Sequence, residues 1–296
     1  MQQPKVSVCM ITYNHEKFIQ EAIEGVLMQQ CDFEIELIVA NDCSTDKTDA
    51  VIQNILKNHP RANWIKYTNH PINKGMMPNF IWALQQCKGK YIALCEGDDY
   101  WTDPLKLQKQ VDFLEKNEEY VLCFHPCDLL ISTSKVKPYI QSQDLDRINY
   151  EYTIKNLLIN WNIPTASMIF RNFEDELPQW VSEVASGDIA LAMILFKKGK
   201  FKLLKEWMSV YRINGSGISS QHVGYKMIHK RAFLYYHLNN FFNFKYEQDI
   251  YDALNQIYII FSNQEELKSI NKLEQSFFKR VIKKIYKKIK QNWQSL

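Results

Sequence analysis

Three acidic side chains follow a buried apolar run near the middle of the sequence. The run covers residues 91–94, and Glu96, Asp98 and Asp99 come within five residues of its end. Neighbouring carboxylates repel one another, so such a cluster is costly unless a cation or a proton offsets the charge. Oxygen donors of this kind suit Mg²⁺ or Mn²⁺, which in turn bind phosphate oxygens. The segment predicts a metal–diphosphate site at a strand end; the alternative is a polar turn, for which Gly-Asp-Asp is also suitable.

The elements that must position this cluster alternate between strand-like and helix-like patterns through the first 125 residues. Strands are expected at Lys5–Tyr13, Phe33–Ala40, Trp64–Thr68, Lys90–Cys95 and Tyr120–His125. Helices are expected at Glu16–Gln30, at Thr48–Asn58, near Asn79–Cys87 and from Pro104 onward. This order predicts an α/β fold, with a mostly parallel sheet covered by helices on both faces.

The alternation of strand-like and helix-like segments becomes less regular beyond residue 151. We expect helices at Tyr152–Ile159 and Asp188–Lys198, and strands at Ala166–Phe170 and Phe201–Tyr211. The sequence after about residue 220 is helical in pattern and rich in aromatic residues. The predicted domains are residues 1–215, which carry the site, and a helical extension over residues 216–296.

Composition narrows the class of protein. Of the 296 residues, 46% are apolar and 23% are charged, which is ordinary for a globular protein. No run of 18 apolar residues is present, and the first residues lack the apolar core of a signal peptide. The seven cysteines are scattered through the chain, which fits a reducing compartment. We therefore expect a cytoplasmic location.

Basic charge is concentrated near the C-terminus. Residues 277–290 contain seven Lys and Arg and no acid; removing those seven charges from a net charge of +3 leaves −4 for the rest. The rest of the chain therefore lacks a nucleic-acid-binding patch. Within residues 277–293, apolar and aromatic side chains occupy one side of a helical wheel, which predicts a helix lying on an anionic membrane surface. The alternative is a helix packed on the body or on a second copy in a homodimer.

Polar residues follow three of the predicted strands where ligands bind in open parallel sheets, beyond the carboxyl ends. The three clusters are Thr12–Asn14 with Glu16, Asn41–Ser44, and Glu96–Asp99. Neither a dinucleotide-binding Gly-x-Gly-x-x-Gly after the first strand nor a P-loop motif is present. The clusters predict one shared crevice.

Four motifs in order resemble the family 2 glycosyltransferases of the GT-A fold, of the bacterial cell-surface polysaccharide type. The motifs are Ile11-Thr-Tyr-Asn14, Asn41-Asp-Cys-Ser-Thr-Asp46, Asn73-Lys-Gly75 with Asn79, and Glu96-Gly-Asp-Asp-Tyr-Trp101. The resemblance covers roughly residues 4–215. It implies that a nucleotide-diphosphate sugar, expected to be UDP-linked, donates a sugar to a glycan or a lipid-linked acceptor with inversion.

The resemblance also implies roles for individual residues. Asp42 matches the acid that hydrogen-bonds the base, and Glu96-Gly-Asp98 takes the place of the Asp-x-Asp motif. Asp98 and Asp99 are both candidates for binding Mn²⁺ or Mg²⁺, and the sequence does not rank them. The expected nucleotide-sugar-binding residues are Thr12, Tyr13, Asn14, Glu16, Asp42, Gly75, Asn79, Glu96 and Asp98.

Ser186-Gly-Asp188 resembles the segment that carries the catalytic base in this family. Asp188 would remove a proton from the acceptor hydroxyl; the alternative is an N-cap of the following helix. Met208–Asn214 resembles a Tyr-Arg-x-His segment, with Asn214 where His often completes the metal shell. The third protein ligand is therefore in question.

Trp101, His125 and Thr165 are candidates for the acceptor side of the crevice. Trp101 could stack on a sugar ring or anchor the core. For His125, the favoured explanation is a histidine at a strand end that hydrogen-bonds to the backbone. Two other functions compete with glycosyl transfer. One is nucleotidyl transfer on a related fold, and the other is a non-catalytic nucleotide-sugar-binding or scaffold protein.

Overall fold

The computed structural model describes residues 3–131, 135–138, 152–159, 161–173, 175–213 and 225–262. The chain divides into two compact units. The first unit comprises Met1–Thr153 and Asn160–Gly217, and the second comprises Ile154–Ile159 and Ile218–Leu296. The second unit thus includes a short segment that the sequence analysis assigned to the first.

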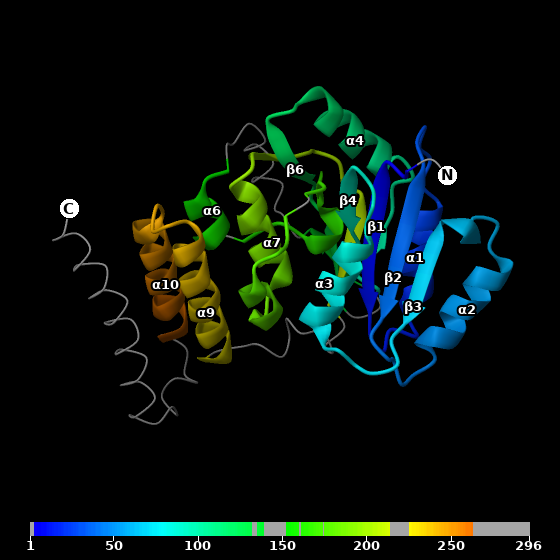
Figure 1. Cartoon of the computed structure of the whole chain (residues 1–296), viewed down its shortest axis with the longest axis horizontal. Coiled ribbons are helices and arrows are strands. Elements are labelled where there is room, and N and C mark those ends of the chain that lie inside the picture. Colours follow the sequence, from blue (N-terminus) through cyan, green and yellow to red (C-terminus); the bar gives the residue numbers. More distant parts are fainter. Residues whose placement is uncertain are drawn as a thin grey trace. The chain divides into compact units, whose positions relative to one another are not determined.

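A seven-stranded sheet forms the centre of the first unit (Figure 1). The strand order is β10-β6-β9-β4-β1-β2-β3. β9 pairs antiparallel with β4 and β6, and the other pairings are parallel, so the expected mostly parallel mixed sheet is confirmed. The strands are β1 (Val6–Thr12), β2 (Ile35–Asn41), β3 (Ile65–Asn69), β4 (Tyr91–Leu94), β6 (Tyr120–Phe124), β9 (Ile169–Arg171) and β10 (Lys200–Leu203).

The central strands are buried on both faces because helices flank the sheet (Figure 1). α1 turns a row of apolar residues inward, including Ile19, Ile23 and Val26. α7 differs, because nearly all of its residues are buried. The helices of this unit are α1 (Ile19–Leu27), α2 (Thr48–Asn58), α3 (Met76–Gln86), α4 (Lys106–Lys116) and α7 (Gly187–Phe196), with 3₁₀ turns at Ala62–Trp64, Thr165–Ser167 and Gln179–Glu183.

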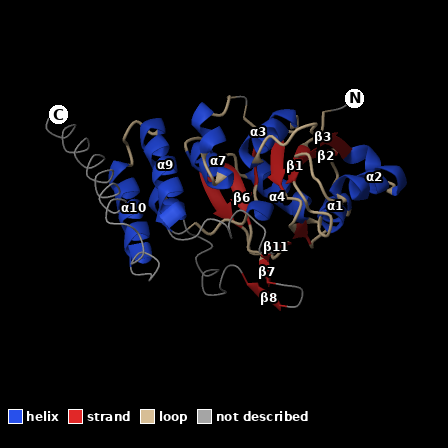
Figure 2. Ribbon diagram, turned by 90° about the horizontal axis from the view of Figure 1, so that it is seen from below, coloured by secondary structure: helices blue, strands red, loops and turns tan. Residues whose placement is uncertain are grey.

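A second, four-stranded sheet adjoins the acidic segment. Its order is β5-β11-β7-β8, formed by Tyr100–Trp101, Ser209–Ile213, Asp128–Ile131 and Lys135–Pro138 (β7, β8 and β11 are labelled in Figure 2). The strand expected over residues 201–211 is in fact two strands, β10 and β11, in different sheets. Exposed Lys205 and Glu206 lie between them, and this break allows the chain to leave one sheet and enter the other.

Three helices build the described part of the second unit. They are α6 (Ile154–Ile159), α9 (Tyr225–Phe241) and α10 (Glu247–Ser262). α10 packs against α6 and α9. Tyr235 donates a buried 2.6 Å hydrogen bond from its hydroxyl to the carbonyl of Leu158 in α6. This bond satisfies one of the carbonyls that the last turn of a helix leaves without a partner.

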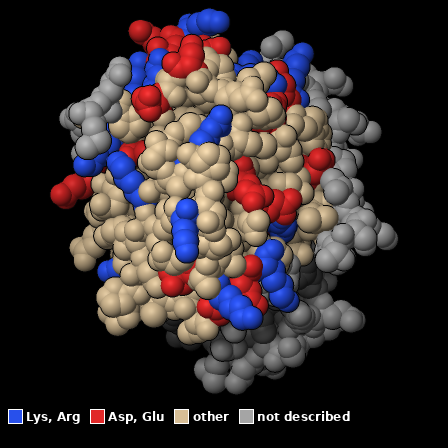
Figure 3. Space-filling model, turned by 90° about the vertical axis from the view of Figure 1, so that its right-hand side faces the viewer, with Lys and Arg blue, Asp and Glu red and all other residues tan. Residues whose placement is uncertain are grey.

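Residues 277–293 lie outside the described residues, so the membrane-surface helix stays a prediction. No helix in the described ranges is both long enough and apolar enough to cross a membrane. On the face shown in Figure 3, Lys and Arg side chains are interspersed with Asp and Glu among the described residues.

Replacing Tyr235 with Phe removes the hydroxyl while keeping the ring. The Leu158 carbonyl then loses its side-chain partner, so we expect the free energy of unfolding to fall by about 1–3 kcal/mol. Urea denaturation followed by circular dichroism measures the change. Tyr236→Phe is the control, because Tyr236 is exposed. Equal midpoints for the two variants would contradict this role of Tyr235.

Candidate functional site

The carboxyl ends of β1, β2 and β4 meet at one edge of the sheet. Thr12 at the end of β1 pairs with Asn41 at the end of β2. Past the end of β4, the chain still runs beside β1, because Gly97 donates its N–H to the Ile11 carbonyl at 3.0 Å. A Cβ on Gly97 would lie 2.7 Å from Thr12 Oγ1, so only glycine allows this approach. The acidic segment therefore lies directly against the end of β1.

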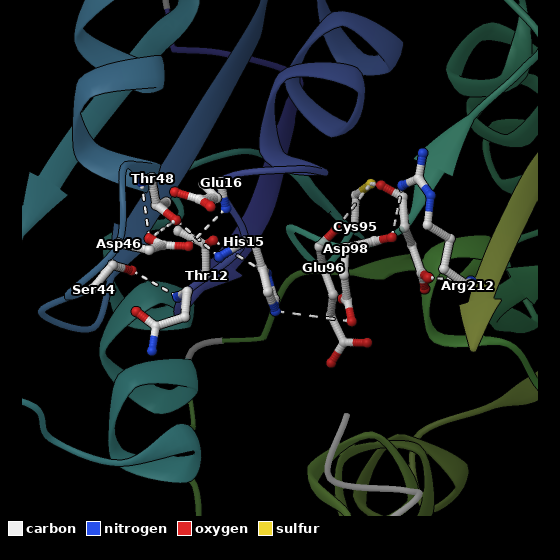
Figure 4. Close-up of polar contacts among 12 residues, drawn as sticks. Thr12, His15, Glu16, Ser44, Asp46, Thr48, Cys95, Glu96, Asp98 and Arg212 are labelled. Carbon is white, nitrogen blue, oxygen red and sulfur yellow. Dashed lines mark hydrogen bonds and ion pairs between the residues drawn. The ribbon is translucent and has the colours of Figure 1, made fainter. Parts of the chain in front are cut away.

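Reciprocal hydrogen bonds join the loop after β1 to the loop after β2 (Figure 4). Asn14 adopts a left-handed conformation, with φ of 56°, at the centre of this contact. The bonds are Asn14 N to Ser44 Oγ (2.9 Å), Thr45 N to Asn14 Oδ1 (2.8 Å), His15 N to Thr48 Oγ1 (2.8 Å), Glu16 N to Asp46 Oδ2 (3.0 Å) and Lys47 N to Glu16 Oε2 (2.9 Å). The side chains of Asn14 and Glu16 thus bind protein groups, while Tyr13, in the loop after β1, is 44% exposed.

Asp42 holds the turn at residues 73–75. Its carboxylate accepts hydrogen bonds from the backbone N–H groups of Lys74 at 2.7 Å and Gly75 at 2.9 Å. Gly75 has a φ of 87°, which favours glycine at this position. Asn79 is buried and donates to the Ala40 carbonyl at 3.0 Å, which ties α3 to β2. These contacts are structural, and nucleotide binding by Asp42, Gly75 and Asn79 stays a prediction.

The structure distinguishes the two candidate metal ligands. Asp99 is 0% exposed, and its Oδ1 accepts a 2.9 Å hydrogen bond from the backbone N–H of Arg212. Among the residues that the structure describes, the second oxygen of Asp99 has no hydrogen-bond partner. Burial beside Asp98 and Glu96 raises the pKa of Asp99 well above its usual range. Asp98 keeps 18% of its side chain exposed, and its Oδ2 lies 3.9 Å from His15 Nε2 (Figure 4). Asp98 is therefore the accessible carboxylate of the pair.

Asp188 and Glu96 act on each other electrostatically. Burial raises the pKa of Glu96 to about 8, and the charges of Asp98 and Asp188 add to the effect. Asp188 lies in the first turn of α7 after the N-cap residue Ser186, whose side chain makes no capping hydrogen bond within the described part of the chain. The hydroxyl of Thr165 contacts the Asp188 carboxylate at 3.4 Å. Asp188 thus lies beside Thr165 and within electrostatic reach of Glu96, at the start of a helix whose N-cap residue is Ser186, and its role as a catalytic base stays a prediction.

Two of the acceptor-side candidates are not surface residues. Trp101 is 2% exposed, donates from Nε1 to the Ala166 carbonyl at 2.8 Å, and packs under the Lys106 ammonium. The core-anchor alternative for Trp101 is therefore correct, since no face of its ring is open to a sugar. His125 is fully buried, and its Nδ1 contacts the Pro126 carbonyl at 2.9 Å, as the favoured backbone-partner explanation predicts.

The oxygen donors of the acidic segment fit a divalent cation that is shared with a ligand. The charge of Asp98 adds to the burial that raises the pKa of Glu96 and of Asp99, and a cation would relieve this repulsion. Among the described residues, no three His, Cys, Asp or Glu side chains are arranged to hold a metal by themselves. Mg²⁺ sites commonly use one or two carboxylates and complete their shell with water and phosphate oxygens. Asn214 lies outside the described residues.

Arg212 is a site residue whose role the sequence analysis did not identify. Its Nη1 donates to the Asp98 carbonyl at 2.7 Å, and its Nη2 pairs with Glu21 of α1. The guanidinium also stacks over the ring of Tyr100 at 4.2 Å. Arg212 reaches the acidic segment because β11 pairs with β5, a contact between residues more than 100 positions apart. The Tyr-Arg-x-His resemblance marked this segment but gave Arg212 no partner.

Solved structures share this architecture. S. aureus TarS in complex with UDP-GlcNAc superimposes with a TM-score of 0.67 at 18% identity, covering 92% of this chain and 77% of that chain. A mannosyltransferase from Pyrobaculum calidifontis, in complex with GDP-Man and Mn²⁺, gives a TM-score of 0.58 at 13% identity, covering 100% and 89%. At these identities the similarity establishes the fold, and the GT-A expectation is confirmed.

The family model described as Glycosyl transferase family 2 matches residues 7–177. That match covers more than half of the chain, so the chain belongs to glycosyl transferase family 2.

Two relatives illustrate the range of similarity. An uncharacterised Mycobacterium tuberculosis protein, Rv1520, is 35% identical over 219 residues, or 72% of this chain and 60% of that protein. The putative teichuronic acid biosynthesis glycosyltransferase TuaG of Bacillus subtilis is 27% identical over 235 residues, or 79% of this chain and 88% of that protein. The chain thus spans less than two thirds of the mycobacterial relative's length.

Replacing Arg212 with Lys keeps the positive charge but removes the planar guanidinium group with its several N–H donors. One ammonium cannot serve the Asp98 carbonyl and Glu21 in the same geometry, so we expect the free energy of unfolding to fall by about 1–3 kcal/mol. The midpoint of chemical denaturation measures this loss. Glu21→Gln is the comparison and should cost less, because it leaves the bond to the Asp98 carbonyl intact. A larger loss for Glu21→Gln than for Arg212→Lys would contradict this assignment.

Proposed function

We propose that this protein transfers a sugar from a nucleotide-diphosphate sugar, expected to be UDP-linked, to a hydroxyl of a glycan or lipid-linked acceptor. The observation that carries the proposal is the convergence of Glu96, Asp98 and Asp188 on the edge of the sheet where β1, β2 and β4 end. The names of TuaG and of TarS in complex with UDP-GlcNAc support a nucleotide-sugar donor and cell-surface polysaccharide synthesis.

The nucleoside end of the donor would lie between the loops after β1 and β2. Exposed Tyr13 offers a ring face there, while the joined loops around Asn14 hold it in place. Asp42 and the turn at residues 73–75 border the same region. In this arrangement the diphosphate would point toward the acidic segment.

Asp98, with Glu96 beside it, would hold Mn²⁺ or Mg²⁺. When bound, such an ion neutralises the negative charge that develops on the leaving diphosphate. Asp99 contributes by keeping its backbone neighbours in place through its bond to Arg212. Arg212 in turn fixes the Asp98 carbonyl, so the carboxylate of Asp98 starts from a defined backbone position.

Asp188 would act as the general base, with the Thr165 hydroxyl orienting its carboxylate. The carboxylate takes the proton of the acceptor hydroxyl as that oxygen attacks the anomeric carbon. The bond from this carbon to the diphosphate breaks, and its electron pair leaves with the diphosphate. A single displacement of this kind inverts the anomeric configuration.

The proposed acceptor is inferred from the basic residues near the C-terminus and from the names of the relatives. A basic amphipathic helix over residues 277–293 would hold the enzyme on the anionic cytoplasmic face of a membrane, beside a lipid-linked acceptor. Packing of the same helix in a homodimer is the competing proposal.

Asp188→Asn keeps the shape of the side chain and removes the base. We expect kcat for transfer to fall by about 10²–10⁴-fold with little change in the KM for the donor, because binding does not need the proton acceptor. Release of nucleoside diphosphate from UDP-, GDP- and dTDP-sugars, with and without Mn²⁺, measures this. Asp175→Asn is the matched control, since Asp175 is an exposed partner of Lys198. Full transfer activity in Asp188→Asn would remove Asp188 from the mechanism.

A further inference from the structure

His15 lies between the end of β1 and the acidic segment, and neither the motifs nor the proposed mechanism gives it a role (Figure 4). Its ring contacts Thr12 on one side, from Nδ1 to Oγ1 at 3.2 Å. Its Nε2 is directed at Asp98 Oδ2, 3.9 Å away. About 20% of the side chain is exposed, so the ring reaches the surface beside Asp98 while most of it is covered by protein.

The hydrogen-bond partners of the ring indicate which nitrogen carries the proton. Thr12 is 2% exposed, and among the described residues the hydrogen-bond partner of its hydroxyl is His15 Nδ1. A buried hydroxyl needs an acceptor for its hydrogen, so Thr12 donates to Nδ1, and the neutral ring carries its own proton on Nε2. The other tautomer would leave the hydroxyl hydrogen unpaired and turn the Nε2 lone pair toward the Asp98 carboxylate.

The surrounding contacts keep the ring in this position. The backbone N–H of His15 donates to Thr48 Oγ1 at 2.8 Å, which fixes the residue from the side of α2. On the other side, a Cβ on Gly97 would lie 3.0 Å from His15 Nδ1, so the acidic segment packs closely against the ring. Restricted on both sides, the ring presents its Nε2–H toward Asp98 in a fixed direction.

We propose that His15 is a positioning residue that donates its Nε2–H to the Asp98 carboxylate and thereby orients the other carboxylate oxygen toward the metal and the diphosphate. The proposal rests on the proposed function, in which Asp98 is the accessible metal ligand. Because 3.9 Å exceeds a direct hydrogen bond, a bridging water or a small shift of Asp98 on metal binding completes the contact. Partners of this kind orient ligating carboxylates in metal sites.

Metal affinity tests the proposal. Mn²⁺ binding is measured by calorimetry in the presence and absence of UDP, for wild type, His15→Phe, His15→Gln and His237→Gln. We expect His15→Phe to weaken Mn²⁺ binding by about 10–100-fold, and His15→Gln, whose amide can donate a hydrogen bond, to recover most of it. UDP affinity without metal should not change in either His15 variant. His237, on α9 of the second unit, provides the matched His→Gln control.

The ring itself supplies a second readout. Long-range ¹H–¹⁵N correlation of ¹⁵N-histidine-labelled protein should show His15 protonated on Nε2 and unprotonated on Nδ1, with or without Mg²⁺. Protonation on Nδ1 would overturn the proposal, as would equal Mn²⁺ affinity in wild type and His15→Phe. A wild-type protein that binds no Mn²⁺ with UDP would refute the metal site of the proposed function, and the role of His15 with it.

Discussion

Repulsion among carboxylates at the end of β4 is the constraint around which the site is built. Glu96, Asp98 and Asp99 lie within four residues of one another, and Asp188 adds its charge from α7. Burial makes the repulsion stronger, because the charges lose their hydration. The fold offsets part of it with Arg212, whose backbone binds Asp99 and whose side chain binds the Asp98 carbonyl. What remains is an accessible carboxylate, Asp98, that a divalent cation would stabilise.

Both sheets hold the acidic segment and its neighbouring loops in place. The parallel register of β1, β2 and β4 brings three loops to one edge, and the hydrogen bonds around Asn14 and Asp42 fix the first two. The second sheet brings β11 beside β5, so that Arg212 meets a segment distant in sequence. Gly97 allows the acidic segment to lie against the end of β1, since a side chain at this position would collide with Thr12.

Sequence reasoning reached the features that depend on local pattern. Apolar runs and turn residues predicted the strands of the main sheet and the edge at which the polar clusters meet. Sequence reasoning did not identify side-chain environments that depend on contacts with residues distant in the sequence. Asp98 and Asp99 are adjacent in sequence, and the hydrogen bond of Asp99 to Arg212 on β11 distinguishes buried Asp99 from accessible Asp98. Likewise, Trp101 is buried against Ala166 and Lys106, and the surroundings of His15 depend on the close approach of Gly97.

The most direct test of the account is a crystal structure with UDP and Mn²⁺, with diffraction recorded at the manganese absorption edge. The account predicts one anomalous peak within ligand distance of an Asp98 oxygen and the diphosphate. It also predicts that Asp99 remains buried and bonded to the Arg212 N–H. A peak coordinated by Asp99 instead of Asp98, or a nucleotide bound away from the ends of β1, β2 and β4, would contradict it.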